Sequence, residues 1–377
     1  MRMVNHQRAP SLSTFRCADR IFRALRLALL MACALGMSYT AHALPVYSRQ
    51  YHVTCGQCHT YAPKLNKFGY AFQANFFNWP GEKVRPKADP TTYFPVSAIT
   101  TYSYQRDISG HQDTAQIRAF ELYLTSGFGS TRRGRGGYFV DLHLDDNPGN
   151  LEDAYFSFPF AGRSGQLALT VGQATPMLFQ VDPVNSLTDT LPFAFKEGSD
   201  NFAWDQTTPV VRFDYFDHRG QLSPDGNYLS VGLPFRGSLS LTRAATLGPQ
   251  SGVFLHGFHR NGFTTYGALA YLHKDASQFG LVGTYAATKK LYLTAIGTIE
   301  HEPGLNTTHT ALEAEYLLNS RLAFTGRTEL IAGNRSELST AAAVNYYPLR
   351  DRFVRFTADL RNRRGNRAFN LFVRFQL

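Results

Sequence analysis

Apolar and polar residues alternate with a period of two along most of the chain after Val96. Residues 138–145, for example, read Tyr-Phe-Val-Asp-Leu-His-Leu-Asp, so every second side chain is apolar and three of those between them are polar or ionisable. Such a period predicts β-strands with two unlike faces. A soluble β-sandwich needs dry interior positions, whereas the polar positions here are often ionised. The pattern therefore favours a barrel with a water-filled lumen and an outer face in contact with outer-membrane lipid.

The same alternation recurs throughout residues 94–377, where glycine, asparagine and aspartate residues mark turns between the repeats. We count 16 or 17 candidate strands. Single-chain bacterial barrels have an even number of strands, so we expect 16 antiparallel strands. Residues 369–377 alternate strictly up to Leu377. The last strands of outer-membrane barrels resemble this stretch, although they usually end in an aromatic residue.

One connection is longer than the others. More than 30 residues separate the strand that ends near Gly172 from the strand that begins near Val210. Counted from a periplasmic N-terminus, this connection is the third external loop. In 16-stranded porins the third external loop commonly folds into the lumen, and by resemblance this one could do the same. An exposed surface loop is the alternative.

Residues 1–43 are typical of a cleaved signal peptide. Six arginines accompany the apolar run Leu27–Met37, and Ala41-His42-Ala43 matches the small-x-small cleavage pattern. A lipoprotein signal ending at Cys33 is the alternative, but it leaves too short an apolar run after Arg26. No later stretch approaches the 18 apolar residues of a spanning helix. Export and the predicted barrel together indicate the outer membrane.

Removing the signal peptide changes the charge balance. It carries six of the 38 basic and one of the 28 acidic residues, so the mature chain has 32 basic and 27 acidic residues, a net charge of +5 rather than +10. The basic excess is small and unclustered, which excludes nucleic acid as a partner. Cys17 and Cys33 leave with the signal peptide, so two cysteines remain.

Those two cysteines form the run Cys55-Gly56-Gln57-Cys58-His59. In a C-x-x-C-H run the thiols add to the vinyl groups of a haem and the histidine binds its iron, so we expect one covalent haem c at Cys55 and Cys58 with His59 as the proximal ligand. A zinc site would need further ligands, and no other cysteine is available. A dithiol redox switch would need a βαβ context that the flanking sequence lacks.

The haem run belongs to a short N-terminal segment, residues 44–93. Leu65, Phe68, Phe72 and Phe76 recur at helical spacing, with Pro63 suited to the first turn. A proline-rich linker follows from Asn78 to Pro95. The membrane-spanning apolar band of such a barrel is about 25 Å tall, and a haem in the periplasm would leave most of that distance without an electron carrier. We therefore expect this α-helical haem segment to plug the lumen of the barrel.

The run Cys55-Gly-Gln-Cys58-His59, followed by Pro63-Lys-Leu-Asn-Lys-Phe-Gly-Tyr-Ala-Phe72, resembles the start of the fused monohaem cytochrome-porins. The specific match covers residues 47–77, and over the barrel only the architecture is similar. The resemblance implies an outer-membrane oxidoreductase that takes electrons from extracellular Fe(II). A soluble periplasmic cytochrome would be the acceptor. The alternative functions are a diffusion porin with a structural or sensory haem plug, or a conduit for another donor.

The second axial ligand of the haem iron is open. Met177 is the only methionine of the mature chain, and it could reach the haem if the third loop folds inward. His52 is the principal alternative; His143, His111 and water are further ones. The lumen carboxylates could hold or steer a cation such as Fe(II), although any water-filled barrel has ionised inward side chains. These carboxylates are Asp141, Asp145, Asp153, Glu313 and Glu315.

Overall fold

The structure is a computed structural model in which Leu44–Leu377 form one compact unit. The residues that it describes are 46–61, 64–81, 96–110, 112–128, 136–144, 150–161, 166–176, 192, 195, 203–204, 206–219, 221–240, 246–333, 336–348, 354–363 and 365–376. The predicted signal peptide and Met177 therefore lie outside the described residues. In the described part, no helix has the length and apolarity needed to cross a membrane.

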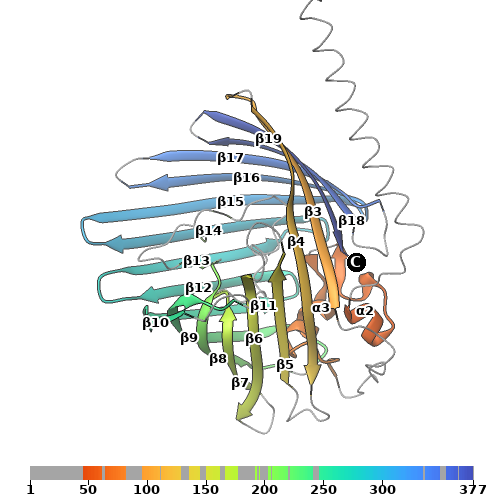
Figure 1. Cartoon of the computed structure of the whole chain (residues 1–377), viewed down its shortest axis with the longest axis vertical. Helices are drawn as coiled ribbons and strands as arrows, with labels where there is room; N and C mark the ends of the chain where they lie inside the picture. Colours follow the sequence, from red (N-terminus) through yellow and green to blue (C-terminus); the bar gives the residue numbers. More distant parts are fainter. Residues whose placement is uncertain are drawn as a thin grey trace, which may run out of the picture. The chain divides into compact units, whose positions relative to one another are not determined.

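Sixteen antiparallel strands of the described chain close into a barrel, as the sequence predicts (Figure 1). The ring closes where the last strand pairs with the first and where β9 pairs with β11. A short additional strand, β10 (Thr246–Gln250), pairs only with the end of β9 and is not part of the ring. The sixteen strands are β3 (Val96–Asp107), β4 (Gln112–Phe128), β5 (Gly136–His143), β6 (Asn150–Ala161), β7 (Leu167–Ala174), β8 (Thr208–Phe216), β9 (Gly226–Ser238), β11 (Val253–Asn261), β12 (Thr264–Leu272), β13 (Ser277–Ala286), β14 (Leu291–Glu302), β15 (Leu305–Asn319), β16 (Leu322–Ala332), β17 (Glu337–Tyr346), β18 (Val354–Arg363) and β19 (Asn366–Gln376).

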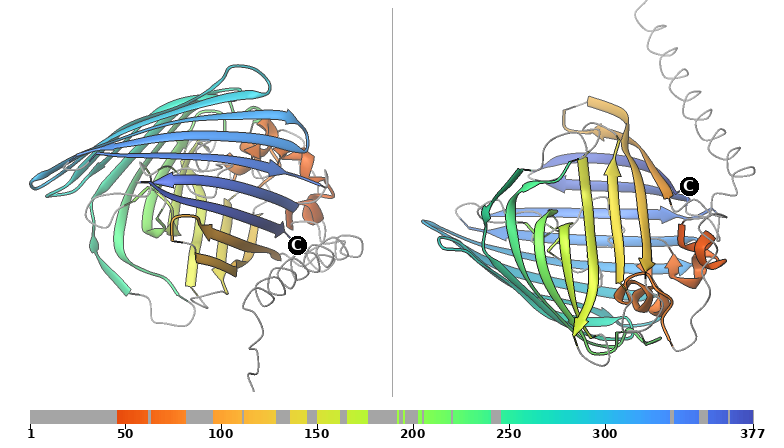
Figure 2. Two further views of the ribbon diagram at one scale, coloured as in Figure 1. Left: turned by 90° about the horizontal axis from the view of Figure 1, so that it is seen from above. Right: turned by 60° about the horizontal axis from the view of Figure 1, so that its bottom comes forward.

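The two faces of the strands differ as the alternation predicts. On β15, Leu312 is 60% exposed whereas Glu315 is 7% exposed, and on β6 Phe156 is 51% exposed whereas Tyr155 is 7% exposed. Large apolar side chains on the outside of a closed barrel match a lipid-facing surface, and ionisable groups inside match a polar lumen. The strands wrap around this lumen in Figure 2.

The N-terminal segment folds into two short helices with a turn and a two-stranded sheet between them. The elements are α2 (Val46–Tyr51), the 3₁₀ turn η1 (Cys55–Gln57), β1 (His59–Tyr61), β2 (Lys64–Leu65) and α3 (Lys67–Ala74). The predicted helix is thus shorter than its apolar spacing indicates. Leu65 belongs to β2 and Phe76 follows the helix, while Asn66 caps the first turn by accepting a hydrogen bond from the Gly69 N–H at 2.9 Å. Pro63 lies outside the described residues.

This segment contacts lumen-facing groups on widely separated strands. The Val46 N–H donates to Ser97 Oγ on β3 at 2.7 Å, and Asn78 Nδ2 donates to the Gly136 carbonyl on β5 at 2.9 Å. Across the barrel, Lys64 Nζ lies 2.9 Å from Glu315 Oε1 on β15. All three contacts lie at the end of the barrel where β3 begins and β19 ends; α2 and α3 lie beside this end in Figure 1.

The long connection between β7 and β8 starts at the opposite end of the barrel. Its Trp204 is fully buried, and its indole Nε1–H donates to Gln278 Oε1 on β13 at 2.6 Å. The indole also packs edge-on against Phe254 on β11, with ring centroids 6.1 Å apart. Gln278 and Phe254 are both buried inward positions. The described part of this connection therefore folds into the lumen, which is the first of the two alternatives that the sequence left open.

Candidate functional site

A cavity of about 330 Å³ lies between the N-terminal segment and the inner face of the barrel. Its volume falls within the range of roughly 300–1,000 Å³ that small-molecule and cofactor sites occupy. Cys55, Cys58 and His59 contribute to its wall from the N-terminal segment. Strands β3, β4, β5, β6 and β19 contribute Ser97, Ile99, Tyr123, Thr125, Phe139, Tyr155 and Arg374. The sequence-predicted haem residues thus share one cavity.

The turn η1 brings the two cysteines to the same side. The Cys58 N–H donates to the Cys55 carbonyl at 3.2 Å, which closes the C-x-x-C run into a compact turn. The side chain of Asn66 donates to the carbonyls of Gly56 and Gln57, both at 3.1 Å. One asparagine therefore fixes the turn that carries the thiols and also caps the helix α3.

Helix α3 packs directly on this turn at Gly69. A Cβ atom on Gly69 would lie 2.1 Å from the Cys58 carbonyl oxygen and 2.9 Å from Cδ2 of Leu65. Both contacts are too close for a real side chain, and the nearer one is to backbone. Gly69, itself part of the cavity wall, is therefore required for the close approach of helix and turn.

Several aromatic side chains line the cavity together with the cysteines. Tyr47 stacks on Phe77 with centroids 5.2 Å apart, and its hydroxyl hydrogen-bonds to Thr125 of β4. Burial raises the pKa of Tyr47 well above its usual value, so its hydroxyl stays neutral. Arg374 places a guanidinium on the wall; its Nη2 lies 3.5 Å from Glu121 Oε2, while its buried Nε has no hydrogen-bond partner among the described residues. This wall suits a flat apolar cofactor with an anionic substituent, because the guanidinium can pair with a carboxylate.

The two alternatives to haem fit the cavity less well. Burial, and to a lesser extent the nearby Cys55, raises the pKa of the Cys58 thiol to about 12, whereas a reactive dithiol needs a stabilised thiolate. Among the described lining residues, only Cys55, Cys58 and His59 are ordinary zinc ligands, one fewer than the four of a structural zinc site.

The residues proposed as the second axial ligand are not brought to the cavity by the described structure. His52 is exposed at the end of α2 and does not line the cavity. His143 lies at the end of β5 and is also absent from the lining. Met177 and His111 lie outside the described residues, so Met177 stays a prediction.

Sequence reasoning missed several residues that shape the cavity. Tyr47, Gly69 and Arg374 all line it. Arg374 stands on the inward parity of the last strand, but nothing in the sequence shows that β19 closes against β3 beside the haem segment. Gly69 lies within the stretch that resembles the cytochrome-porins, and its steric role becomes visible only with the fold.

No family model matches this chain, and no curated protein matches it. Solved structures of porins do match. An anion-selective porin from Comamonas acidovorans is 11% identical with a TM-score of 0.56, and the match covers 75% of this chain and 98% of the porin. OmpT of Vibrio cholerae and Salmonella typhi OmpF in complex with daunomycin are each 10% identical with TM-scores of 0.56. The OmpT match covers 75% of this chain and 98% of OmpT, and the OmpF match covers 75% and 97%.

The chain therefore has the fold of the outer-membrane porins. The match leaves about a quarter of the chain uncovered. Together, the porin fold and the apolar outer face place this barrel in an outer membrane, as predicted.

Proposed function

We propose that the protein is an outer-membrane cytochrome-porin that carries electrons across the membrane through one covalently attached c-type haem. The observation that supports this most strongly is the cavity that joins the C-x-x-C-H run to the lumen wall. A haem there would be held by Cys55 and Cys58 and bound at its iron by His59. It would supply a one-electron carrier, and the protein would supply position and surroundings.

The surroundings that the chain provides suit electron transfer. The aromatic side chains Tyr47, Phe72, Phe77 and Phe139 line the cavity with apolar surface, and the polarity of the surroundings is one means of tuning a reduction potential. The lumen contacts of Val46, Lys64 and Asn78 hold the segment in one position.

The position of the N-terminal segment suggests a direction of electron flow. It lies at the end of the barrel where the first strand begins and the last strand ends, which in porin-type barrels is the periplasmic end. An electron donor would then enter from the opposite mouth, and a periplasmic cytochrome would accept the electron. By the family resemblance, we propose extracellular Fe(II) as the donor.

A diffusion porin is the second candidate, and the fold likeness to an anion-selective porin favours it. Two features favour the conduit instead. The N-terminal segment occupies one end of the lumen, and Trp204 is buried against the inner faces of β11 and β13. Planar-bilayer recordings distinguish the two: an electron conduit gives little ion conductance, whereas a diffusion porin gives steady open-pore currents.

Haem attachment tests the central assignment. The Cys55→Ser/Cys58→Ser double variant cannot form thioethers, so we expect its denatured band to lose peroxidase staining completely. Thr60→Ser, at an exposed position beside the motif, is the matched control and should keep full staining. The heat-dependent gel mobility of both proteins reports barrel folding. Staining that survives in the folded double variant would refute covalent attachment.

A further inference from the structure

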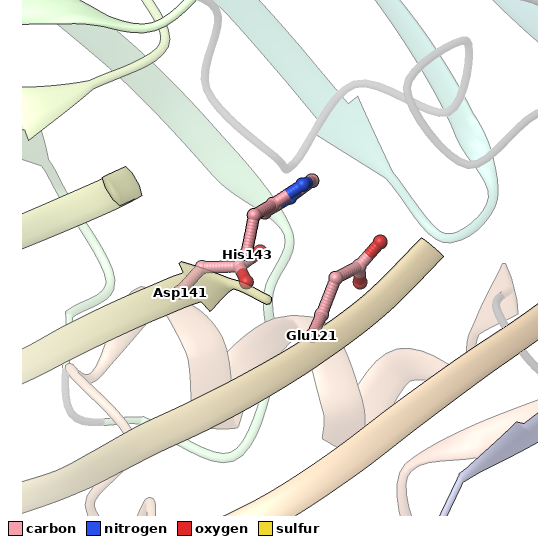
Figure 3. Close-up of side chains that lie close together, drawn as sticks. All are labelled: Glu121, Asp141 and His143. Atoms are coloured by element: carbon pink, nitrogen blue, oxygen red, sulfur yellow. The ribbon is translucent and has the colours of Figure 1, made fainter. Parts of the chain in front are cut away.

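Three potential metal ligands meet on the inner wall of the barrel, outside the cavity. Glu121 of β4 and Asp141 and His143 of β5 each offer one donor atom, and these atoms all lie within 4.8 Å of one another. Figure 3 shows the three side chains on two neighbouring strands, all extending from the same side of the sheet. Glu121 and Asp141 are buried and His143 is half-buried.

Strand register explains this meeting. Antiparallel pairing sets Glu121 opposite His143 and Tyr123 opposite Asp141. Directly opposed residues of an antiparallel pair have Cβ atoms about 5 Å apart on the same face. Positions 121, 123, 141 and 143 all have inward parity, so the four side chains form one compact group on the lumen wall.

The charges of this group are poorly balanced. Glu121 is 6% exposed and Asp141 is 5% exposed, and the buried Oδ1 of Asp141 has no hydrogen-bond partner among the described residues. Asp153 on the neighbouring strand β6 is 5% exposed, and in the described part of the chain its Oδ1 has no partner either. The guanidinium of Arg374 lies 3.5 Å from Glu121. A buried carboxylate oxygen without a hydrogen-bond partner is costly, and a bound cation would offset that cost.

We propose that Glu121, Asp141 and His143 form a binding site for one divalent first-row transition metal ion. Two carboxylates and an imidazole suit Mn(II), Fe(II) or Zn(II), whereas Ca²⁺ and Mg²⁺ take oxygen ligands only and copper(I) prefers sulfur. The Nε2 of His143 lies 2.5 Å from Glu152 Oε2. A carboxylate in this position fixes the orientation of a metal-binding imidazole.

The location of this metal site indicates a role in receiving the electron donor, an inference that rests on the proposed function. Tyr123 lines the cavity and donates its hydroxyl hydrogen to Glu121, and Arg374 contacts both the cavity and Glu121. Glu121 and Tyr123 are two positions apart along β4, a rise of roughly 7 Å. The metal site is displaced from the cavity toward the mouth opposite the N-terminal segment. It therefore lies where an incoming Fe(II) ion would arrive before its electron enters the cavity.

Metal binding can be measured on the reconstituted haem-loaded protein with Mn(II) alone, because free Mn(II) gives a paramagnetic resonance signal that is lost on binding. We expect one Mn(II) per chain in the wild type. Glu121→Gln and Asp141→Asn should each weaken binding at least tenfold while preserving size and hydrogen-bonding shape. Glu313→Gln removes a different inward carboxylate, paired with Arg327 at 3.4 Å, and should bind Mn(II) as the wild type does. Heat-dependent gel mobility checks that every variant is folded.

The result that would overturn the site is Mn(II) binding that is absent from the wild type or unchanged in both folded variants. A parallel arm separates this outcome from failure of the proposed function. In that arm the haem is reduced by Fe(II) and by a small organic donor. Mn(II) bound as expected without any reduction by either donor would refute the conduit and leave the site standing. If the site binds Fe(II), Asp141→Asn should raise the Fe(II) concentration needed for the half-maximal rate of haem reduction. The rate of haem reduction by the organic donor should stay unchanged.

Discussion

Lys64 links the N-terminal segment to the far wall of the barrel, and replacing it by methionine should release that link. Its ammonium lies 2.9 Å from Glu315 Oε1, and the two side chains are 4% and 9% exposed. It also lies 3.5 Å from the centre of the Tyr292 ring. Lys64→Met keeps most of the volume of the side chain but removes the ammonium from beside the buried Glu315 carboxylate.

Breaking a buried ion pair from one side costs about 3–5 kcal/mol, because the remaining charge is uncompensated. Lumen water and protonation of Glu315 can relieve part of this cost, so we take the lower end, about 3 kcal/mol, as the expected loss of unfolding free energy. Since each 1.4 kcal/mol is a factor of ten, the equilibrium changes roughly a hundredfold.

Urea unfolding of the reconstituted protein, together with limited proteolysis of the N-terminal segment, measures this loss. Lys67→Met is the matched control. Its ammonium pairs with Asp225 at 3.4 Å but its side chain is 55% exposed, so the change should cost less than about 1 kcal/mol. Lys64→Met/Glu315→Leu removes both charges and should recover most of the stability. Equal costs for the two single lysine variants would refute the position of Lys64 inside the lumen.

Two further changes test the packing and the membrane-facing surface. On an open helix surface, Gly69→Ala would stabilise the helix by about 1 kcal/mol. Here the added Cβ would collide with the Cys58 carbonyl oxygen, so we expect a lower free energy of unfolding and less haem incorporation. Urea unfolding and peroxidase staining measure the two effects, and a stabilised variant would contradict the close approach of helix and turn. Leu312→Arg, at a 60% exposed outer position of β15, should cost about 2–4 kcal/mol if it lies near the bilayer midplane. The inward Glu313→Gln should cost less, because its amide oxygen can still accept a hydrogen bond from Arg327, which also pairs with Glu329 at 2.8 Å. Equal tolerance of the two changes in vesicle-folding titrations would contradict a lipid-facing outer surface.

The barrel could be predicted from the sequence because each strand carries its own two-residue period. Leu312 and Glu315 could be assigned to opposite faces without knowing their neighbours, and the observed exposures agree. The even number of strands decided between 16 and 17 candidates, and the additional β10 lies outside the closed ring. The inward fold of the β7–β8 connection followed from a likeness to porins rather than from its own residues.

What the sequence could not supply is which distant residues meet. The Lys64–Glu315 pair joins residues 251 positions apart, and no local pattern selects that partner. Register is equally hidden: the alternation puts Glu121 and His143 on the inner face, but only the pairing of β4 with β5 sets them opposite one another. The apolar spacing from Leu65 predicted too long a helix. Leu65 pairs in the strand β2, and the side chain of Asn66 caps the helix, so that the helix begins only at Lys67.

Electron transfer through vesicles tests the central claim most directly. The purified protein is inserted into sealed liposomes that enclose an oxidised soluble cytochrome, and Fe(II), which cannot cross the bilayer, is added outside. Our account predicts that the haem is reduced first and that the enclosed cytochrome is reduced afterwards, while Cys55→Ser/Cys58→Ser liposomes show neither change. An enclosed cytochrome that stays oxidised with Fe(II) and with every other impermeant donor, although the haem is attached and the barrel folded, would contradict the electron conduit.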